Sequence, residues 1–229
     1  MQCYCTEMDD SVKPRSPRYR STLRAEQASQ TKRRVLEAAA RLFLERGYTR
    51  TTVAAVAEAA GVAPETIYAG FQGKRGLLEG VIDDAIAPNG NWHDDLVDEL
   101  TTLPTARERL RGFVGLCCGT LSRTSPYHVV IRGAADSEAF AVALRARLLD
   151  VRLTRTSQRL ARLVPDALRP GLTHEQAAER FSALLSPELH NLLISEYGWS
   201  PAAYEAWVAS VAEAELLGIV PTAANGPEG

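Results

Sequence analysis

Cationic side chains are concentrated in the first fifty residues of the chain. From Ser11 to Arg50 there are eleven lysines or arginines against three acids, whereas residues 89–229 carry thirteen bases against seventeen acids. The formal net charge of −2 for the whole chain conceals this separation. Clustered ammonium and guanidinium groups can neutralise phosphates, so this segment could bind nucleic acid through salt-dependent contacts. A charged run alone also fits a solvated helix face beside a disordered tail.

Two expected helix starts further along the chain could bind anions. Thr51 and Thr52 precede an apolar segment and are suitable N-cap residues. Lys74 follows Gly73 where we expect another helix to begin. The free N–H groups and the dipole at a helix N-terminus favour a phosphate. We therefore expect an anion at Lys74 and phosphate contacts at Thr51 and Thr52.

Short helices and tight turns follow one another from residue 30 to residue 86. Apolar residues repeat at intervals of three or four up to Gly47, and again over Val53–Ala60, which indicates two amphipathic helices. A turn follows at Gly61, and Pro64 suits the first turn of a third helix. Two short helices joined by such a turn form a helix-turn-helix unit, whose second helix fits the major groove of DNA.

The third helix would carry the residues that read bases. It begins with Pro64, Glu65 and Thr66. A glutamate carboxylate can accept a hydrogen bond from the cytosine amino group, and a threonine methyl can pack on that of thymine. We expect Ile67 and Phe71, by contrast, to be core residues.

The segment from about Thr31 to Ile86 resembles the N-terminal domain of the TetR family of transcriptional repressors. In that family the third helix often has the pattern S-x-G-T-L-Y-x-H-F-x-S-K, and residues 63–74 here are APETIYAGFQGK. Thr66, Tyr68 and Lys74 match the pattern. The resemblance implies that the third helix lies in the major groove and that the Tyr68 hydroxyl and the Lys74 amine bind phosphate oxygens.

Three departures from that pattern affect the helix cap or the expected DNA contacts. Ala63 replaces the frequent serine cap, which weakens the helix start by about 1 kcal/mol. Glu65 replaces a glycine and places an acid near the DNA, and Gly70 replaces a histidine and removes one phosphate contact. These changes affect single contacts rather than the motif.

The composition indicates a soluble globular protein of one or two domains. Hydrophobic residues make up 45% and charged residues 24% of 229 residues. No apolar run approaches the roughly 20 residues of a membrane span, and the N-terminus lacks the apolar region of a secretory signal. We expect a cytoplasmic protein with no membrane partner, no cofactor and no metal. Cys117 and Cys118 are adjacent and would diverge on a helix, so we interpret them as small buried hydrophobic residues rather than a redox or metal site.

Helical periodicity continues to the end of the chain, which predicts an all-α fold of about nine helices. We expect a three-helix helix-turn-helix domain followed by a helical ligand-binding and dimerisation domain. A short helix should open at Pro126, and a long one should run from Ser137 to Leu163 with arginines on its outer face. The expected units are a disordered basic arm at 1–24, which could contact DNA or remain idle, a DNA-binding domain at 25–87, a C-terminal domain at 88–220 and a disordered tail at 221–229.

The C-terminal part resembles the ligand-binding and dimerisation domains of the same family. In that family the last two long helices pair with their copies in a twofold dimer. The apolar residues on these helices exceed what one layer of helices would bury, and a dimer suits palindromic operators. The predicted interface residues are Leu184, Leu189, Leu192, Trp207, Val208 and Val211.

A pocket for a small, mostly apolar effector should lie among the middle helices, in keeping with ordinary pocket chemistry. Each candidate residue also fits plain core packing. The candidates are Trp92, Phe113, Cys117, Tyr127, Ile131, Phe140 and His190.

The sequence therefore predicts a homodimeric, ligand-responsive regulator that binds a double-stranded DNA operator, most simply a repressor. An enzyme is disfavoured because no nucleophile elbow, phosphate loop, dinucleotide fingerprint or paired metal-binding histidines occur. A constitutive architectural DNA-binding protein without an effector is the alternative. Release of a specific operator by a small molecule would distinguish the two.

Overall fold

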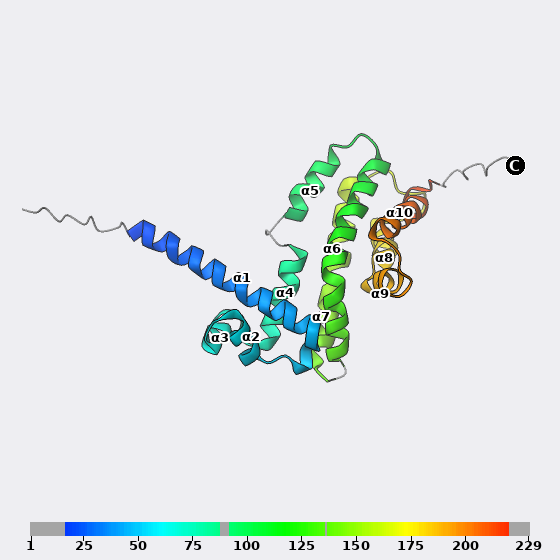
Figure 1. Cartoon of the computed structure of the whole chain (residues 1–229). Helices are drawn as coiled ribbons and strands as arrows, with labels where there is room; N and C mark the ends of the chain where they lie inside the picture. Colours follow the sequence, from blue (N-terminus) through cyan, green and yellow to red (C-terminus); the bar gives the residue numbers. More distant parts are fainter. Residues whose placement is uncertain (1–16, 88–91, 136, 220–229) are drawn as a thin grey trace, which may run out of the picture.

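The computed structural model describes residues 17–87, 92–135 and 137–219 (Figure 1). Within these ranges every regular element is a helix, so the predicted all-α fold is confirmed. The predicted tail at 221–229 and the first sixteen residues of the predicted arm lie outside the described residues.

The N-terminal part is built from α1 (Pro17–Arg50), α2 (Val53–Ala60), α3 (Pro64–Phe71) and α4 (Lys74–Ile86). The prediction of a disordered arm was wrong for residues 17–24, because α1 already begins at Pro17. Proline is favoured at a first helical position, and the following residues up to Gln30 include no further proline and no glycine. Gly47 interrupts the helical geometry near the end of α1 with φ 75° and ψ 171°, as expected of a glycine at a helix stop.

The rest of the chain forms longer helices with short additions. The elements are α5 (Trp92–Thr101), α6 (Ala106–Ala135), α7 (Ala139–Leu163), α8 (His174–Leu184), α9 (Pro187–Asn191), the π-helical turn η1 (Leu192–Glu196), α10 (Pro201–Ala212) and the π-helical turn η2 (Glu213–Leu217).

The structure corrects the prediction of a separate helix opening at Pro126. This proline lies inside the continuous helix α6. Its missing N–H and its ring cost about 3 kcal/mol in a helix interior. However, α6 packs against α1, α4, α5, α7, α9 and α10 along its length, and burial of those faces outweighs the local cost.

Three helices in the C-terminal part begin at side-chain caps. Thr173 and Gln176 form a capping box at the start of α8. The hydroxyls of Ser186 and Ser200 accept hydrogen bonds from backbone N–H groups three residues on, and each is followed by proline at the first helical position.

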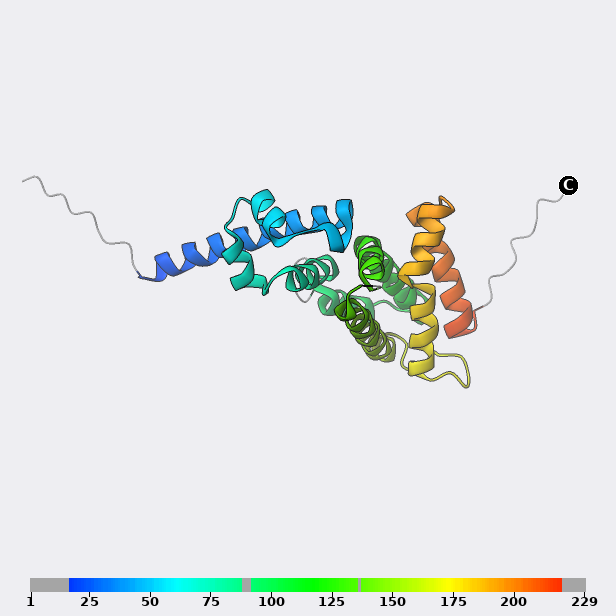
Figure 2. The ribbon, with the colours of Figure 1, turned by 90° about the horizontal axis from the view of Figure 1, so that it is seen from below.

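The helices are arranged in three groups along the molecule, as Figures 1 and 2 show. Helices α1 to α4 lie at one end, α6 and α7 occupy the middle, and α8 to α10 form the far side. The first turns of α1 project away from the other helices in both views.

Two hydrophobic clusters hold these groups together. The head core joins α1 to α4 with the C-terminal part of α6 and the N-terminal part of α7, through Val130, Ile131 and Leu144 among others. The body core joins the other halves of α6 and α7 to α5, α8, η1, α10 and η2. Helices α6 and α7 thus enter both cores, and the boundary between the cores crosses the middle of these two helices.

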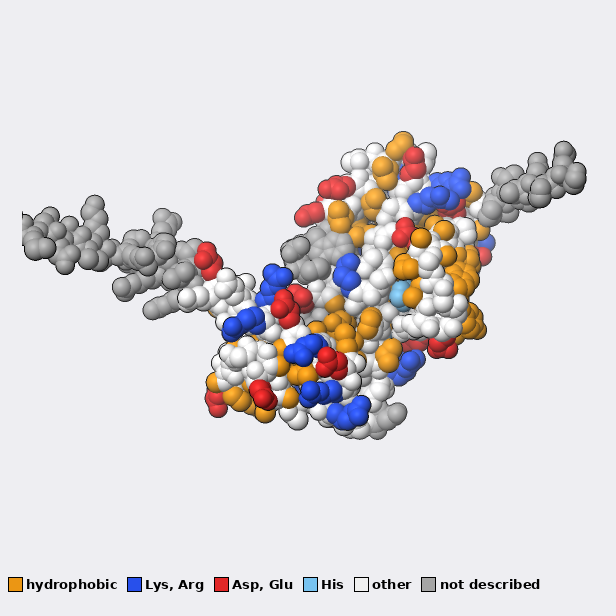
Figure 3. Space-filling view, in the orientation of Figure 1, with side chains coloured by type: hydrophobic (Ala, Val, Ile, Leu, Met, Phe, Trp, Pro, Cys, Tyr) orange, Lys and Arg blue, Asp and Glu red, His pale blue; other side chains and the backbone are white. Residues whose placement is uncertain are grey.

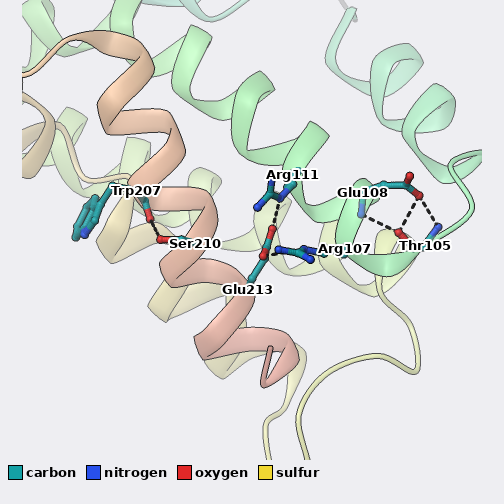
Figure 4. A network of polar contacts seen from close by, with 7 residues as sticks. All are labelled: Thr105, Arg107, Glu108, Arg111, Trp207, Ser210 and Glu213. Atoms are coloured by element: carbon teal, nitrogen blue, oxygen red, sulfur yellow. Dashed lines mark hydrogen bonds and ion pairs between the residues drawn. The ribbon is translucent and has the colours of Figure 1, made fainter. Parts of the chain in front are cut away.

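An ion-pair network fastens the last helical turn to the start of α6 (Figure 4). The Glu213 carboxylate has only 4% of its side chain exposed and accepts hydrogen bonds from Arg107, at 2.9 Å, and from Arg111. Burial opposes ionisation, but the two guanidinium groups outweigh it and hold the pKa of Glu213 below its usual value. The network therefore contributes to the stability of the body.

Candidate DNA-binding surface and effector cavity

Helices α2 and α3 meet at a tight turn that presents one face of α3 to solvent. Gly61 ends α2 in the left-handed conformation (φ 65°), and the N–H of Val62 returns to the carbonyl of Ala57. Ile67 is fully buried and anchors α3 to the head core. The predicted base-reading residues, Pro64, Glu65 and Thr66, are all exposed and lie together in the first turn of α3.

The α3 start is weakly capped, as predicted from Ala63. This residue occupies the N-cap and offers no side-chain hydrogen bond. Pro64 has no N–H and the N–H of Thr66 donates to the carbonyl of Ala63, so the N–H of Glu65 is the one in this turn left for an outside acceptor such as a phosphate.

The two threonines before α2 have different roles. Thr52 is exposed, and its hydroxyl accepts a hydrogen bond from the N–H of Ala55. Thr51 is fully buried, and its hydroxyl donates to the carbonyls of Leu42 and Gly47. A buried hydroxyl with two internal acceptors cannot reach a phosphate, so we withdraw Thr51 from the predicted DNA contacts. Its single hydroxyl hydrogen is instead shared between two carbonyls near the interrupted end of α1.

Tyr68 stands on the exposed side of α3, with 58% of the residue accessible to solvent. Its ring edge lies against Gly73, where the Cβ atom of any other residue would be 3.5 Å from the Tyr68 Cε1 atom. Gly73 has φ 104°, a conformation that disfavours other residues. The positive φ, rather than the space beside the tyrosine ring, therefore favours glycine at this position, because a Cβ at 3.5 Å would make an ordinary contact.

Lys74 is held at the start of α4 by contacts that sequence reasoning missed. Its Nζ donates to the carbonyl of Thr49 at 3.1 Å and lies 4.2 Å from the centre of the Tyr48 ring. Burial lowers the pKa of Lys74, although Glu138 opposes that shift. Only one of the three ammonium hydrogens is used by Thr49, so the group can still donate to a phosphate. Tyr48 is buried and also contacts Phe43 and Phe140, so it positions the lysine.

The surface around these helices carries most of the basic residues of the described head. Figure 3 shows blue side chains spread over the α1–α4 region, with acidic side chains between them. Arg33 pairs with Glu37 at 3.0 Å, and Arg75 pairs with Glu79 at 3.1 Å. The exposed bases on α1 are Lys32, Arg33, Arg34, Arg41, Arg46 and Arg50.

A cavity of about 490 Å³ lies between α6, α7, α8 and α9. Its wall also includes Ile86, the last residue of α4. Three of the exposed large hydrophobic residues of the described chain belong to this wall, namely Val142, Leu149 and Val151. Apolar side chains left open to solvent in a concave site indicate a site for an apolar ligand.

Among the predicted pocket residues, only Cys117 lies in the cavity wall. Phe113 packs behind the wall, stacked on Phe181 with ring centres 5.1 Å apart. His190 is buried, with Nδ1 3.0 Å from the Ser125 hydroxyl and its ring edge against Tyr204. The side chain of Trp92 lies outside the described residues.

Tyr127, Ile131 and Phe140 were also predicted for the pocket, but they pack in or against the head core. These residue types suit an apolar pocket. However, they lie on the faces of α6 and α7 that point toward α1 and α4. Burial raises the pKa of the Cys117 and Cys118 thiols to about 12. Both are therefore neutral thiols, in keeping with the interpretation as small hydrophobic residues.

The arginines of α7 were predicted to face outward, and four of them instead line the cavity. They are Arg145, Arg152, Arg155 and Arg159. A spacing of seven residues places Arg145, Arg152 and Arg159 on nearly one helix face, and this was the signal in the sequence. Glu188 is the acidic residue of the wall, and it pairs with Arg145 at 3.0 Å.

His128 also lies in the wall and is neutral at pH 7. Burial, and after it the charge of Arg152, lowers the pKa of His128 to about 4. The cavity is thus mainly apolar, with a surplus of positive charge on the α7 side.

The predicted dimer residues fall into two groups. Leu184, Leu189, Leu192, Trp207 and Val211 are partly exposed. Figure 3 shows hydrophobic side chains gathered over this α8–α10 side. Val208 is fully buried within its own chain. Its side chain packs in the body core and cannot form a contact between copies, so we withdraw it from the predicted interface.

Comparison with known proteins gives matches over both parts of the chain. Residues 35–81 match the family model described as bacterial regulatory proteins, tetR family. The transcriptional regulator TtgR of Pseudomonas putida is 43% identical over 58 residues, which are 25% of this chain and 28% of that protein. The chain thus spans well under half of the curated relatives that it matches, at 28% to 41% of their lengths.

Solved structures extend the similarity to nearly the whole fold. NalD of Pseudomonas aeruginosa, the secondary repressor of a multidrug efflux pump, has a TM-score of 0.61 at 21% identity, covering 83% of this chain and 98% of that chain. A protein from Saccharomonospora viridis in complex with choline has a TM-score of 0.62 at 23% identity, covering 82% and 98%. At these identities the likeness concerns the fold. Within the described residues, no helix combines the length and apolar character that a membrane crossing requires.

Proposed function

We propose that this chain, which belongs to the TetR family of bacterial regulatory proteins, is a homodimeric repressor that a small molecule releases from its operator. The observation that carries the proposal is the placement of α4. Its first residue, Lys74, lies beside the exposed face of α3, and its last residue, Ile86, lies in the cavity wall. One helix of thirteen residues therefore joins the DNA-binding surface to the cavity.

Contacts along α4 allow a ligand to act on it. The carbonyl of Ala85 accepts a hydrogen bond from Arg123 of α6 at 3.1 Å, and Glu79 lies 3.9 Å from Arg147 of α7. Both α6 and α7 supply cavity wall. A ligand that separates α6 from α7 would shift the far end of α4, and in a dimer this would change the spacing of the two α3 helices. DNA and ligand would then favour different arrangements, so each would weaken the binding of the other.

The proposed DNA contacts follow from exposure. Phosphates would be bound by Thr52, the Tyr68 hydroxyl and Lys74, which fix position without reading sequence. Bases would be read by Pro64, Glu65 and Thr66 in the major groove. The partly exposed apolar residues of α8, α9, η1 and α10 would pair the two copies, and the half-sites would repeat at about 34 Å, one turn of DNA.

The cavity favours this proposal over a constitutive architectural DNA-binding protein. An architectural protein has no use for a concave apolar site, whereas here such a site is in contact with the end of α4. NalD, which has a similar fold, is a repressor, and this supports the same role here. The chemistry of the proposed site requires no covalent step, and the regulator interpretation involves no catalysis.

The test is to footprint the purified protein on the DNA upstream of its own gene and repeat the footprint with fractionated metabolite extracts. We expect a protected palindrome that is lost when one fraction is added. A specific footprint that no fraction alters, although the fractions contain compounds that bind the protein, would favour the architectural alternative.

A further inference from the structure

Arg152 differs from the other arginines of the cavity wall, which are paired with acids or, in the case of Arg155, exposed to solvent. Arg145 pairs with Glu188 at 3.0 Å, and Arg159 pairs with Asp94 at 3.1 Å. The Arg152 Nε atom is buried and has no hydrogen-bond partner among the described residues. Its Nη1 atom lies 3.5 Å from the Leu185 carbonyl, at the limit of a hydrogen bond.

A guanidinium group in this position calls for an acceptor. Burial lowers the pKa of Arg152, but an arginine side chain stays charged in proteins. A buried guanidinium with an unpartnered Nε atom and one weak hydrogen bond is unfavourable, and a carboxylate is an acceptor that can bind the arginine fork in a bidentate way. The Nε–Nη2 edge is the one that remains, because Nη1 faces Leu185. The side chain has to rotate for this edge to face the cavity, since Nε is out of contact with solvent.

The other residues of the cavity wall determine which groups the rest of the ligand can contain. His128 is neutral, and Glu188, which forms its ion pair with Arg145, acts on Arg152 through its charge without a hydrogen bond to it. The other wall residues near α7 include the solvent-exposed Val142 and Leu149. A ligand that satisfies Arg152 can therefore cover these apolar side chains with the remainder of its surface.

We infer that the cavity selects an amphipathic anion, a small molecule that joins an apolar body to one carboxylate, and that Arg152 binds the acidic end. This inference rests on the proposed function and specifies the chemical class of the effector. The choline complex of the similar S. viridis protein shows that a protein of this fold can take a cation, so the wall residues rather than the fold set the sign of the ligand charge.

The experiment compares three probes that share one apolar chain: decanoate, decanol and decylammonium. Each is titrated calorimetrically into the full-length protein without DNA, at neutral pH and below micelle formation. We expect decanoate to bind at least about tenfold more tightly than the alcohol, because a charge-assisted bidentate pair replaces a neutral contact, and decylammonium to bind most weakly. Naphthoate and naphthalenemethanol form a second pair, which distinguishes an aromatic body from an aliphatic one.

Variants locate the acidic end of the ligand. Arg152→Gln should reduce the affinity for the carboxylate to that for the alcohol and leave the alcohol unchanged. Arg162→Gln is the matched control, because Arg162 lies on the same helix outside the wall and pairs with Asp98; it should keep the wild-type ranking. The wild-type ranking by itself tests the preference for an anion, even if Arg152→Gln does not fold.

The inference is overturned if both alcohols bind as tightly as their carboxylates, if the ammonium probe binds best, if neither carboxylate binds, or if folded Arg152→Gln keeps the preference. Operator release is measured separately with the same probes. A carboxylate that binds through Arg152 without releasing the operator would refute the proposed function and leave the inference intact. Release of the operator by the neutral probes alone would overturn the inference and leave the proposed function intact.

Discussion

The head core and the body core differ in how their residues come together. In the head, residues that act together are close in sequence: the turn at Gly61, the buried Ile67 and the glycine beneath Tyr68 all lie within two short helices and the turns that end them. In the body, the cavity is formed by residues from α6, α7, α8 and α9 that are far apart in the chain. The proposed DNA-binding surface is thus encoded locally, and the proposed effector cavity depends on packing.

The boundary between the two cores is where the cavity lies. On α6 the body core extends to Leu121 and the head core begins around Val130, and cavity residues such as Thr124 and His128 lie between them. A ligand at this boundary touches helices that belong to both cores. Such a ligand can change the position of one core relative to the other without disrupting either.

The largest expected effect is on assembly. Leu192→Asp combined with Val211→Asp should convert the protein to monomers and weaken operator binding by roughly 100-fold or more, about 3 kcal/mol, because charges are costly in an apolar interface. Sedimentation and operator titration measure both results. Val129→Asp is the control, since Val129 is an exposed apolar residue of α6 outside the last two helices. A double variant that stays dimeric would place the interface elsewhere.

The second effect separates stability from binding. Glu213→Gln should lower the free energy of unfolding by about 1–3 kcal/mol at pH 7, because two charge-assisted hydrogen bonds are weakened. Since the pKa of Glu213 is lowered in the folded state, its contribution is complete above the unfolded pKa and is lost as the pH falls through the folded pKa. Denaturant unfolding should therefore show the difference from wild type shrinking below about pH 4.5.

A neighbouring carboxylate provides the control for that prediction. Glu108→Gln alters only an exposed contact with Thr105 and should change stability by less than about 0.5 kcal/mol. The role given to Glu213 would be wrong if its variant matched the wild type at pH 7, or if the difference grew on acidification.

The third effect concerns the head alone. Lys74→Ala should weaken binding to operator and random DNA alike, by about tenfold, and reduce the salt slope by roughly one. Fluorescence anisotropy over a range of salt concentrations measures both quantities. Thr66→Ala is the contrasting variant and should change the preferred base at one position. A Lys74 variant with altered sequence preference and unchanged affinity for random DNA would refute the phosphate role.

The smallest effect tests the connection between the cores. Ile86→Ala should leave operator affinity within about twofold of wild type, a change of under about 0.5 kcal/mol, but reduce release by the effector, because the end of α4 then loses contact with the cavity contents. Operator titrations with and without effector give the ratio of the two operator affinities, which measures release. Val53→Ala, on α2 and outside the cavity wall, should keep the full response. Normal release in the Ile86 variant would mean that coupling bypasses this end of α4.

The sequence was sufficient for the fold class, the helix-turn-helix elements and most helix caps, because capping and periodicity depend on neighbouring residues. It misplaced Thr51, whose acceptors Leu42 and Gly47 lie at the end of another helix. It also misassigned Ile131 and Phe140 to the pocket and missed Arg152. Thr51 lies between α1 and α2, so its contacts with α1 depend on folding rather than on local spacing. For Ile131, Phe140 and Arg152, the face of a long helix turns toward a neighbour that periodicity alone does not identify.

The central claim is that operator and effector exclude one another through α4. Its most direct test measures operator affinity with and without saturating effector, and effector affinity with and without saturating operator. We expect both affinities to fall by the same factor, between about 5- and 150-fold, as linkage requires for a coupling of about 1–3 kcal/mol. If the dimer binds effector and operator together with neither affinity changed, the claim is contradicted.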